Sequence, residues 1–160
     1  MKRLLALLCA SLVLAGCVTM PEAAKQSAIE DIVNIPGKEK NEIYTASKIW
    51  IAETFNSAKA VIEIDDKEMG LIIGNGTIKF PCDSEQTCLM RSSYNLRFTM
   101  RVDIKNQKIK TTFSNLRMVS TYYAWEGPLY EIDFVATKSA LIDLNRKMSQ
   151  SLLKVDNSTW

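Results

Sequence analysis

The sequence contains no histidine among its 160 residues. This absence excludes a Ser-His-Asp triad, a Cys-His catalytic pair, an imidazole general base and a zinc site with histidine ligands. The most apolar stretch, Leu4–Leu14, has 11 residues, about half of the ~20 that a transmembrane helix requires. An apolar fraction of 47% with 24% charged residues is typical of a globular protein of one domain and excludes a disordered tail, a collagen-like repeat and a polytopic membrane protein.

The first seventeen residues have the pattern of an export signal. Lys2 and Arg3 form a positive region, Leu4–Leu14 an apolar region, and the sequence Leu-Ala-Gly-Cys ends at Cys17. This order resembles the lipobox of bacterial lipoproteins, in which the cysteine is acylated and becomes the first residue. We therefore expect a signal peptide over 1–16, a lipid on Cys17 and a tether over 17–27.

The alternatives are a plain N-terminal helix and an ordinary signal peptide, neither of which requires a cysteine at this position. Acyl chains on Cys17 would anchor the protein firmly, because each buried methylene contributes about 0.8 kcal/mol. Val18 follows the cysteine, and by resemblance to enterobacterial sorting a residue other than Asp there favours the outer membrane. We expect the domain to face the periplasm.

The formal net charge of +2 belongs to this signal. Two of the 20 basic residues precede Cys17, whereas all 18 acidic residues follow it, so cleavage would leave a domain with a net side-chain charge of zero. A neutral domain lacks the basic excess that binding of nucleic-acid phosphates requires. We expect no nucleic-acid partner.

Two cysteines follow Cys17, at positions 82 and 88. An even pair in an oxidising compartment predicts a disulfide, here closing a polar surface loop. The chain-entropy estimate for so short a loop is about 2–2.5 kcal/mol. A reactive redox pair is the alternative, but the spacing differs from Cys-x-x-Cys and there is no flanking cation.

Apolar periodicity predicts the secondary structure. Strands are expected over 28–35, 60–65, 71–80, 94–105 and 109–118, and helices over 41–57 and 137–155. The segment 94–105 alternates apolar and polar residues over its whole length, as in a strand with one buried face. The segment 119–136 is expected to be a loop with a short extended piece over 129–135.

This order of elements predicts an α+β fold with two layers. Sequential strands joined by short turns form an antiparallel sheet, here of about five strands. Each of the two helices has a single apolar stripe, so both are expected on one face, leaving the other sheet face in water. Residues 28–160 would form this single domain.

Several segments resemble the family called domain of unknown function 4468, which is described as having a fold like the TATA-box-binding protein (TBP). The resemblance covers about residues 28–118 and lies in Ile35–Lys38, Ile43–Tyr44, Lys48–Phe55, Asp65–Glu68 and Gly70–Ile78. It implies a curved antiparallel sheet with helices on its convex side and no particular activity. A TBP-like fold does not by itself imply DNA binding.

Two surfaces are candidates for binding. The exposed face of the 94–118 hairpin is predicted to carry a basic stripe of Arg97, Arg101, Lys105 and Lys110, which would attract an acidic ligand or form a solvated face that opposes aggregation. The second candidate is an aromatic cluster of Tyr122, Tyr123, Trp125 and Tyr130. Exposed rings would suit sugar stacking or a protein contact; we expect most of them to be buried, with Trp125 the most exposed.

Two further motifs have simple structural interpretations. Gly74-Asn75-Gly76 lies between apolar strand residues and lacks the Lys-Ser/Thr of a phosphate loop, so a bend of the strand or a close approach of the backbone is expected there. Asp65, Asp66 and Glu68 are expected to form a solvated turn and not a calcium site, because the Ca-loop pattern is absent. We expect no metal and no cofactor.

The sequence therefore favours a non-enzymatic envelope lipoprotein that binds a protein or glycan partner. A lipid anchor would raise the effective concentration of even a weak binder. One alternative is an immunity or exclusion lipoprotein directed against a toxin or phage protein. A second is a carboxylate-dependent hydrolase, which would need a deep pocket with two paired acids.

Overall fold

The computed structural model describes residues 22–24, 28–55 and 62–154. The predicted signal peptide, Cys17 and most of the predicted tether lie outside this range, as do residues 56–61 and 155–160 at the ends of predicted elements. No helix of the described residues is long and apolar enough to cross a bilayer. The elements in chain order are β1 (Ile29–Asn34), α2 (Lys40–Thr54), β2 (Ile62–Asp66), β3 (Leu71–Lys79), α3 (Glu85–Arg91), β4 (Tyr94–Lys105), β5 (Lys108–Ser120), β6 (Glu126–Pro128) and α4 (Glu131–Lys154).

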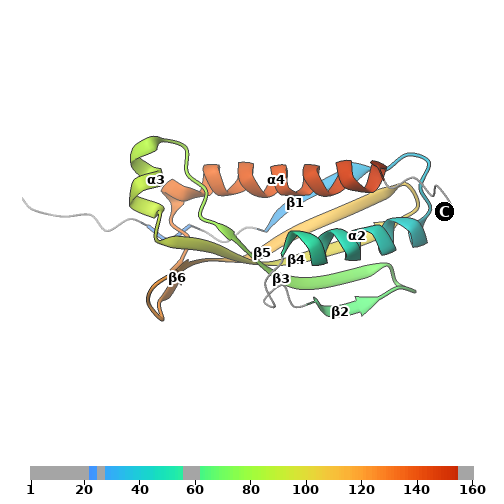
Figure 1. The fold of residues 1–160 in the computed structure, drawn as a ribbon, viewed down its shortest axis with the longest axis horizontal. Helices are drawn as coiled ribbons and strands as arrows, with labels where there is room; N and C mark the ends of the chain where they lie inside the picture. The colour runs from blue at the N-terminus through green and yellow to red at the C-terminus, as the bar shows by residue number, and fades with distance from the viewer. Residues whose placement is uncertain (1–21, 25–27, 56–61, 155–160) are drawn as a thin grey trace, which may run out of the picture.

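One antiparallel sheet organises the chain. Its strand order is β1-β5-β4-β3-β2, and β6 pairs with the end of β5. The helices α2 and α4 lie together on one face of the sheet (Figure 1). The α+β class and the two-layer arrangement predicted from the sequence are confirmed, with β6 as a sixth strand.

The alternation predicted for 94–105 is confirmed in β4. Every second side chain from Leu96 to Ile104 is buried, and the residues between them are exposed or half-buried. Phe98 packs edge-to-face against Phe113 of β5, with ring centroids 5.5 Å apart. This aromatic pair lies at the centre of the core beneath the helices, where removal of apolar surface from water stabilises the fold.

A bulge in β5 keeps this burial pattern in register. The β4–β5 ladder shifts between the pairs Arg97–Arg117 and Thr99–Ser114. Asn115 has φ = 51°, in the left-handed region that asparagine tolerates better than most residues. The extra residue lets both Phe113 and Leu116 face the core.

The helix α4 is fixed to the sheet by a buried polar chain. The Thr111 hydroxyl of β5 donates to Asn145 Oδ1 at 2.7 Å, and Asn145 Nδ2 donates to Asp31 Oδ2 of β1 at 2.7 Å. Asp31 and Thr111 are partners across the β1–β5 ladder. Because Asn145 is 1% exposed, these bonds satisfy groups that would otherwise be buried without partners.

The prediction of a loop around the cysteines was wrong: residues 85–91 form the helix α3. The Ser84 hydroxyl caps it by accepting a hydrogen bond from the Thr87 backbone N–H at 3.2 Å. The helix buries no residue, so it has no apolar stripe that periodicity would reveal. Its polar residues are those that a turn would also use.

The prediction for 119–136 was also wrong at its C-terminal end. The short strand there is β6, at 126–128, and α4 begins at Glu131, six residues before its predicted start. The β-branched Ile132 and Val135 indicated an extended segment, but both side chains point to solvent from the first turns of the helix. Glu131 and Asp133 favour this helix start because carboxylates stabilise the positive end of the helix dipole.

Candidate functional site

The open face of the sheet carries a polar groove of about 600 Å³ across β1, β5 and β4. Residues of neighbouring strands form three cross-strand rows in it. Its lining combines four cations, two carboxylates, a threonine and an isoleucine: Arg101, Lys105, Lys108, Lys110, Glu30, Asp103, Thr112 and Ile32. Side chains alternate between the two faces of a strand, so these residues point away from the layer that contains α2 and α4.

Two ion pairs join two of these three rows, and the third row contains Lys105 and Lys108. Arg101 Nε lies 2.8 Å from Asp103 Oδ2 and Arg101 Nη2 lies 2.7 Å from Asp103 Oδ1, a two-point contact along β4. Lys110 Nζ lies 2.8 Å from Glu30 Oε1, which links β5 to the edge strand β1. All four side chains are at least one-third exposed, so each pair contributes little to folding stability.

These contacts change the acidities of the paired groups. The hydrogen bond from Arg101 lowers the pKa of Asp103, and the contact with Asp103 raises the pKa of Arg101. The hydrogen bond from Lys110 lowers the pKa of Glu30. Both carboxylates are therefore ionised at neutral pH and hold their cations in place.

Two cations at one end of the groove have no such partner. Lys105 and Lys108 are direct partners across the β4–β5 hairpin. The side-chain ammonium group of neither lysine forms a hydrogen bond or a salt bridge with another described residue. Like charges directly opposite each other in a sheet are destabilising, so an anion bound between these two lysines would relieve their repulsion.

The structure divides the basic stripe predicted from the sequence. Arg101, Lys105 and Lys110 line the groove, whereas Arg97 pairs with Glu126 of β6 at 2.6 Å, outside it. Periodicity placed Asp103 on this face but did not mark it as a site residue, and it gave no indication of Lys108 or of the β1 residues Glu30 and Ile32. The two β1 residues join the site only because β1 pairs with β5, a long-range contact that no local signal in the sequence indicates.

The aromatic cluster is not part of the groove. Tyr122 and Tyr123 are 77% and 79% exposed, and the Ser120 hydroxyl accepts a hydrogen bond from each of their backbone N–H groups. The predictions of mostly buried rings and of Trp125 as the most exposed were wrong. Trp125 is 42% exposed because its ring packs edge-to-face on Tyr94 and covers Gly127.

The remaining motifs have structural roles. Gly76 lies in β3 directly beneath the ring of Phe98, the close approach predicted for it. In the acidic turn, Asp65 pairs with Lys48 and Asp66 accepts the Met69 backbone N–H at 2.8 Å. Within the described residues no cluster of three or more acidic or cysteine side chains could hold a metal ion.

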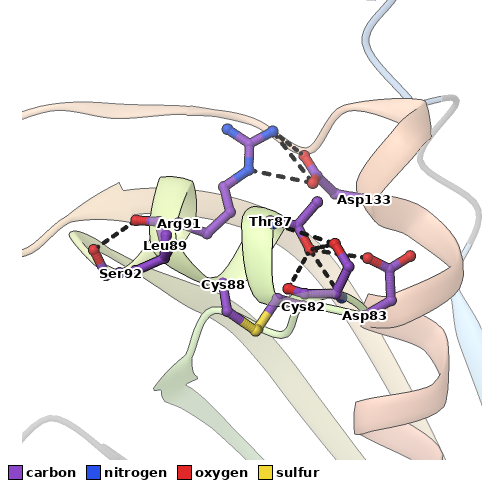
Figure 2. The surroundings of a disulfide bond; sticks show 9 residues. Cys82, Asp83, Thr87, Cys88, Leu89, Arg91, Ser92 and Asp133 are labelled. Carbon is purple, nitrogen blue, oxygen red and sulfur yellow. Dashed lines mark hydrogen bonds and ion pairs between the residues drawn. A yellow bond between two sulfur atoms is a disulfide. The ribbon is translucent and has the colours of Figure 1, made fainter.

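Cys82 and Cys88 are joined by a disulfide across the first turns of α3, with Cα atoms 5.1 Å apart (Figure 2). From the end of the same helix Arg91 reaches Asp133, in the first turn of α4. A second cavity of about 450 Å³ lies between the two helices. The disulfide and the ion pair thus hold a short helix against the end of the domain.

Comparison with known proteins identifies the family of this chain. Residues 30–118 match the domain of unknown function DUF4468 with TBP-like fold. The chain belongs to the DUF4468 family. The match includes β1 to β4 and most of β5, and so contains every residue of the groove.

Solved structures similar to this DUF4468 chain include two from bacteria of different genera. A TBP-like protein from Parabacteroides distasonis has a TM-score of 0.61 at 12% identity over 85% of this chain and 98% of its own. A DUF4468 family protein from Bacteroides ovatus has a TM-score of 0.58 at 13% identity over 88% and 93%. At such identities the likeness shows the fold alone. No curated protein is similar to the chain.

Proposed function

We propose that this DUF4468 protein is a lipid-anchored, non-enzymatic binding protein of the bacterial envelope, whose groove binds an anionic glycan or protein segment. The observation that carries the proposal is the pair Lys105 and Lys108, two adjacent cations at one end of the groove whose ammonium groups form no salt bridge with any described carboxylate. The order of Lys2, Arg3, the apolar run and Cys17 supports the lipid anchor and the envelope location.

The charges and the openness of the groove favour binding over catalysis. Each of its two carboxylates holds a cation and has a lowered pKa, whereas a general acid that acts near neutral pH needs a raised pKa. The groove is open to solvent and therefore excludes little water from a reaction. An extended anionic chain could lie along the sheet face, with the aliphatic side chain of Ile32 beside it.

Charge reversal at the two unpaired lysines tests the groove. The variant Lys105→Glu/Lys108→Glu should bind poly-glutamate and polygalacturonate, a protein-like and a glycan anion, more weakly than the wild type in calorimetry at low salt. Two exposed charge contacts of about 0.5–1 kcal/mol each correspond to a loss of roughly tenfold in affinity. The protein is used from residue 17 onward with Cys17→Ser.

The matched control makes the same change in charge on the opposite face of the sheet. Lys138 and Lys154 are exposed on α4, and Lys138→Glu/Lys154→Glu should leave both affinities unchanged. Stronger binding of one polymer would identify the partner as a glycan or as a protein. Binding of neither polymer, or equal weakening by the two double variants, would contradict the proposal.

The anchor is tested separately. Cells labelled with radioactive palmitate should incorporate label into the wild-type protein and not into Cys17→Ser. Label retained by the variant would refute acylation at this residue and leave the groove assay unaffected.

A further inference from the structure

The first described residues are fixed to one end of the domain. Ala24 N–H donates to Leu129 O at 2.9 Å, Glu131 N–H donates to Glu22 O at 3.2 Å, and Ala23 bridges to Tyr130. The chain therefore enters the fold where β6 leads into α4. Figure 1 shows α3, β6 and the start of α4 together at this end of the long axis.

This end exposes large apolar side chains from three separate segments. They are Leu89 and Met90 of α3, Tyr122 and Tyr123 of the loop before β6, and Ile132 and Val135 of α4, each 72–79% exposed. Exposed apolar residues are ordinary when single, but a group at one end of a molecule indicates a contact surface. Tyrosine is also enriched where proteins meet the lipid–water interface.

The length of the preceding chain limits what this surface can contact. Glu22 is five residues after Cys17, so even a fully extended chain spans about 17 Å between them, at roughly 3.4 Å per residue. A lipid on Cys17 holds that residue at the bilayer surface. The apolar end of the domain is then kept close to the hydrocarbon of the bilayer. Their separation is at most about the thickness of one headgroup layer plus the diameter of one helix.

We propose that this end of the domain lies on the lipid bilayer, with the six apolar side chains entering the interface and the groove directed away from the membrane. This orientation rests on the lipid anchor in the proposed function. The contact is apolar and not electrostatic, because acidic side chains flank it: Glu85 lies in the first turn of α3 and Glu131 in the first turn of α4. Lys105 lies at the other end of β4 from Tyr94, about 36 Å away at ~3.3 Å per residue, and Lys108 lies beside it at the start of β5.

A chemically supplied anchor tests the orientation without requiring acylation in cells. In the chain from residue 17 onward, Cys82 and Cys88 are in the disulfide, so Cys17 is the single thiol and can be coupled to a maleimide lipid in phosphatidylcholine vesicles. Brominated acyl chains quench tryptophan at the interface. Trp125 lies at the apolar end. Its contribution to the fluorescence is the difference in tryptophan emission between the wild type and Trp125→Phe.

Trp125 emission from the coupled wild type should be weaker on brominated than on plain vesicles, as expected for a ring at the interface. Tyr122→Ser/Tyr123→Ser should abolish the difference, while Ile49→Ser, which removes an exposed apolar residue of α2, should preserve it. Vesicles with anionic lipid should give no stronger quenching. Absence of quenching in the coupled wild type would overturn the proposal, as would dimerisation of the uncoupled protein that Tyr122→Ser/Tyr123→Ser abolishes.

Discussion

The Arg91 guanidinium holds both carboxylate oxygens of Asp133, with Nη2 at 2.9 Å from Oδ2 and Nε at 3.3 Å from Oδ1. Arg91 ends α3, and Asp133 lies in the first turn of α4. Their side chains are 23% and 9% exposed, the least exposed of the ion pairs in the described residues. The pair joins α3 to the first turn of α4. The sequence analysis predicted neither the helix α3 nor a helical conformation for the first turn of α4.

Removing Asp133 should destabilise the protein more than removing an exposed partner. Asp133→Ala leaves the Arg91 guanidinium partly buried without a carboxylate, at a cost of about 2–3 kcal/mol. The control Asp143→Ala breaks two exposed pairs on α4, with Arg146 and Lys147, and should cost less than about 1 kcal/mol. Urea unfolding measures both costs, and equal costs would show that the buried pair has no special role.

The disulfide should stabilise α3 more than the domain. A seven-residue helix is too short to persist alone, and α3 buries no side chain. Cys82→Ser/Cys88→Ser releases a short loop, for which the chain-entropy model gives about 2 kcal/mol. We expect the amides of 85–91 to lose protection in hydrogen exchange while those of β4 and β5 keep theirs. Equal loss across the sheet would contradict this.

Gly76 should tolerate no side chain while Phe98 is in place. A Cβ at this position would lie 2.6 Å from two ring carbons of Phe98, and this ring is 1% exposed and packed on Phe113. Gly76→Ala should lower the free energy of unfolding by about 1–3 kcal/mol, the usual cost of overpacking a core. The same substitution in a Phe98→Leu background should cost less, because the smaller side chain leaves space. Additive costs would contradict the contact as the cause.

The sequence predicted those parts of the fold in which burial follows a regular period. The alternation of β4 and the apolar stripe of α4 correspond directly to faces of the structure. The predictions from the sequence were wrong where capping, a disulfide or contacts between distant residues determine the structure. α3 depends on a serine cap, a disulfide and an ion pair. Trp125 is less exposed than Tyr122 and Tyr123 because its ring folds back over Gly127.

In the groove, too, the sequence predicted what depends on periodicity and missed what depends on contacts between distant residues. Periodicity predicted that Arg101, Lys105 and Lys110 share an exposed face, as they do. It could not predict that Glu30 would neutralise Lys110, because the two residues are distant in the chain and meet only through the register of β1 on β5. It also placed Asp103 on the same face without indicating that its carboxylate would hold Arg101.

The two carboxylates of the groove should oppose binding of an anionic ligand. Glu30→Gln/Asp103→Asn releases Lys110 and Arg101 from their ion pairs and raises the net charge of the lining residues from +2 to +4. Calorimetry with dextran sulfate, whose charge does not change with pH, should show roughly tenfold tighter binding at pH 7 for two added charge contacts. The control Asp143→Asn, on the exposed side of α4, should change nothing.

The same two groups determine how wild-type binding and stability change with pH. Both carboxyl pKa values are lowered in the folded protein, mainly by the hydrogen bonds from Lys110 and Arg101. Their contribution to stability is therefore complete above the ordinary carboxyl pKa values of about 4 and is lost as the pH falls through the lowered values. The wild type should be slightly more stable than Glu30→Gln/Asp103→Asn at pH 6, and in urea unfolding the difference should shrink as the pH falls below the ordinary carboxyl pKa of about 4. Over the same range wild-type affinity for dextran sulfate should rise towards that of the variant, because protonation frees the same two cations. A difference in stability that does not depend on pH would show that the ion pairs are not its source.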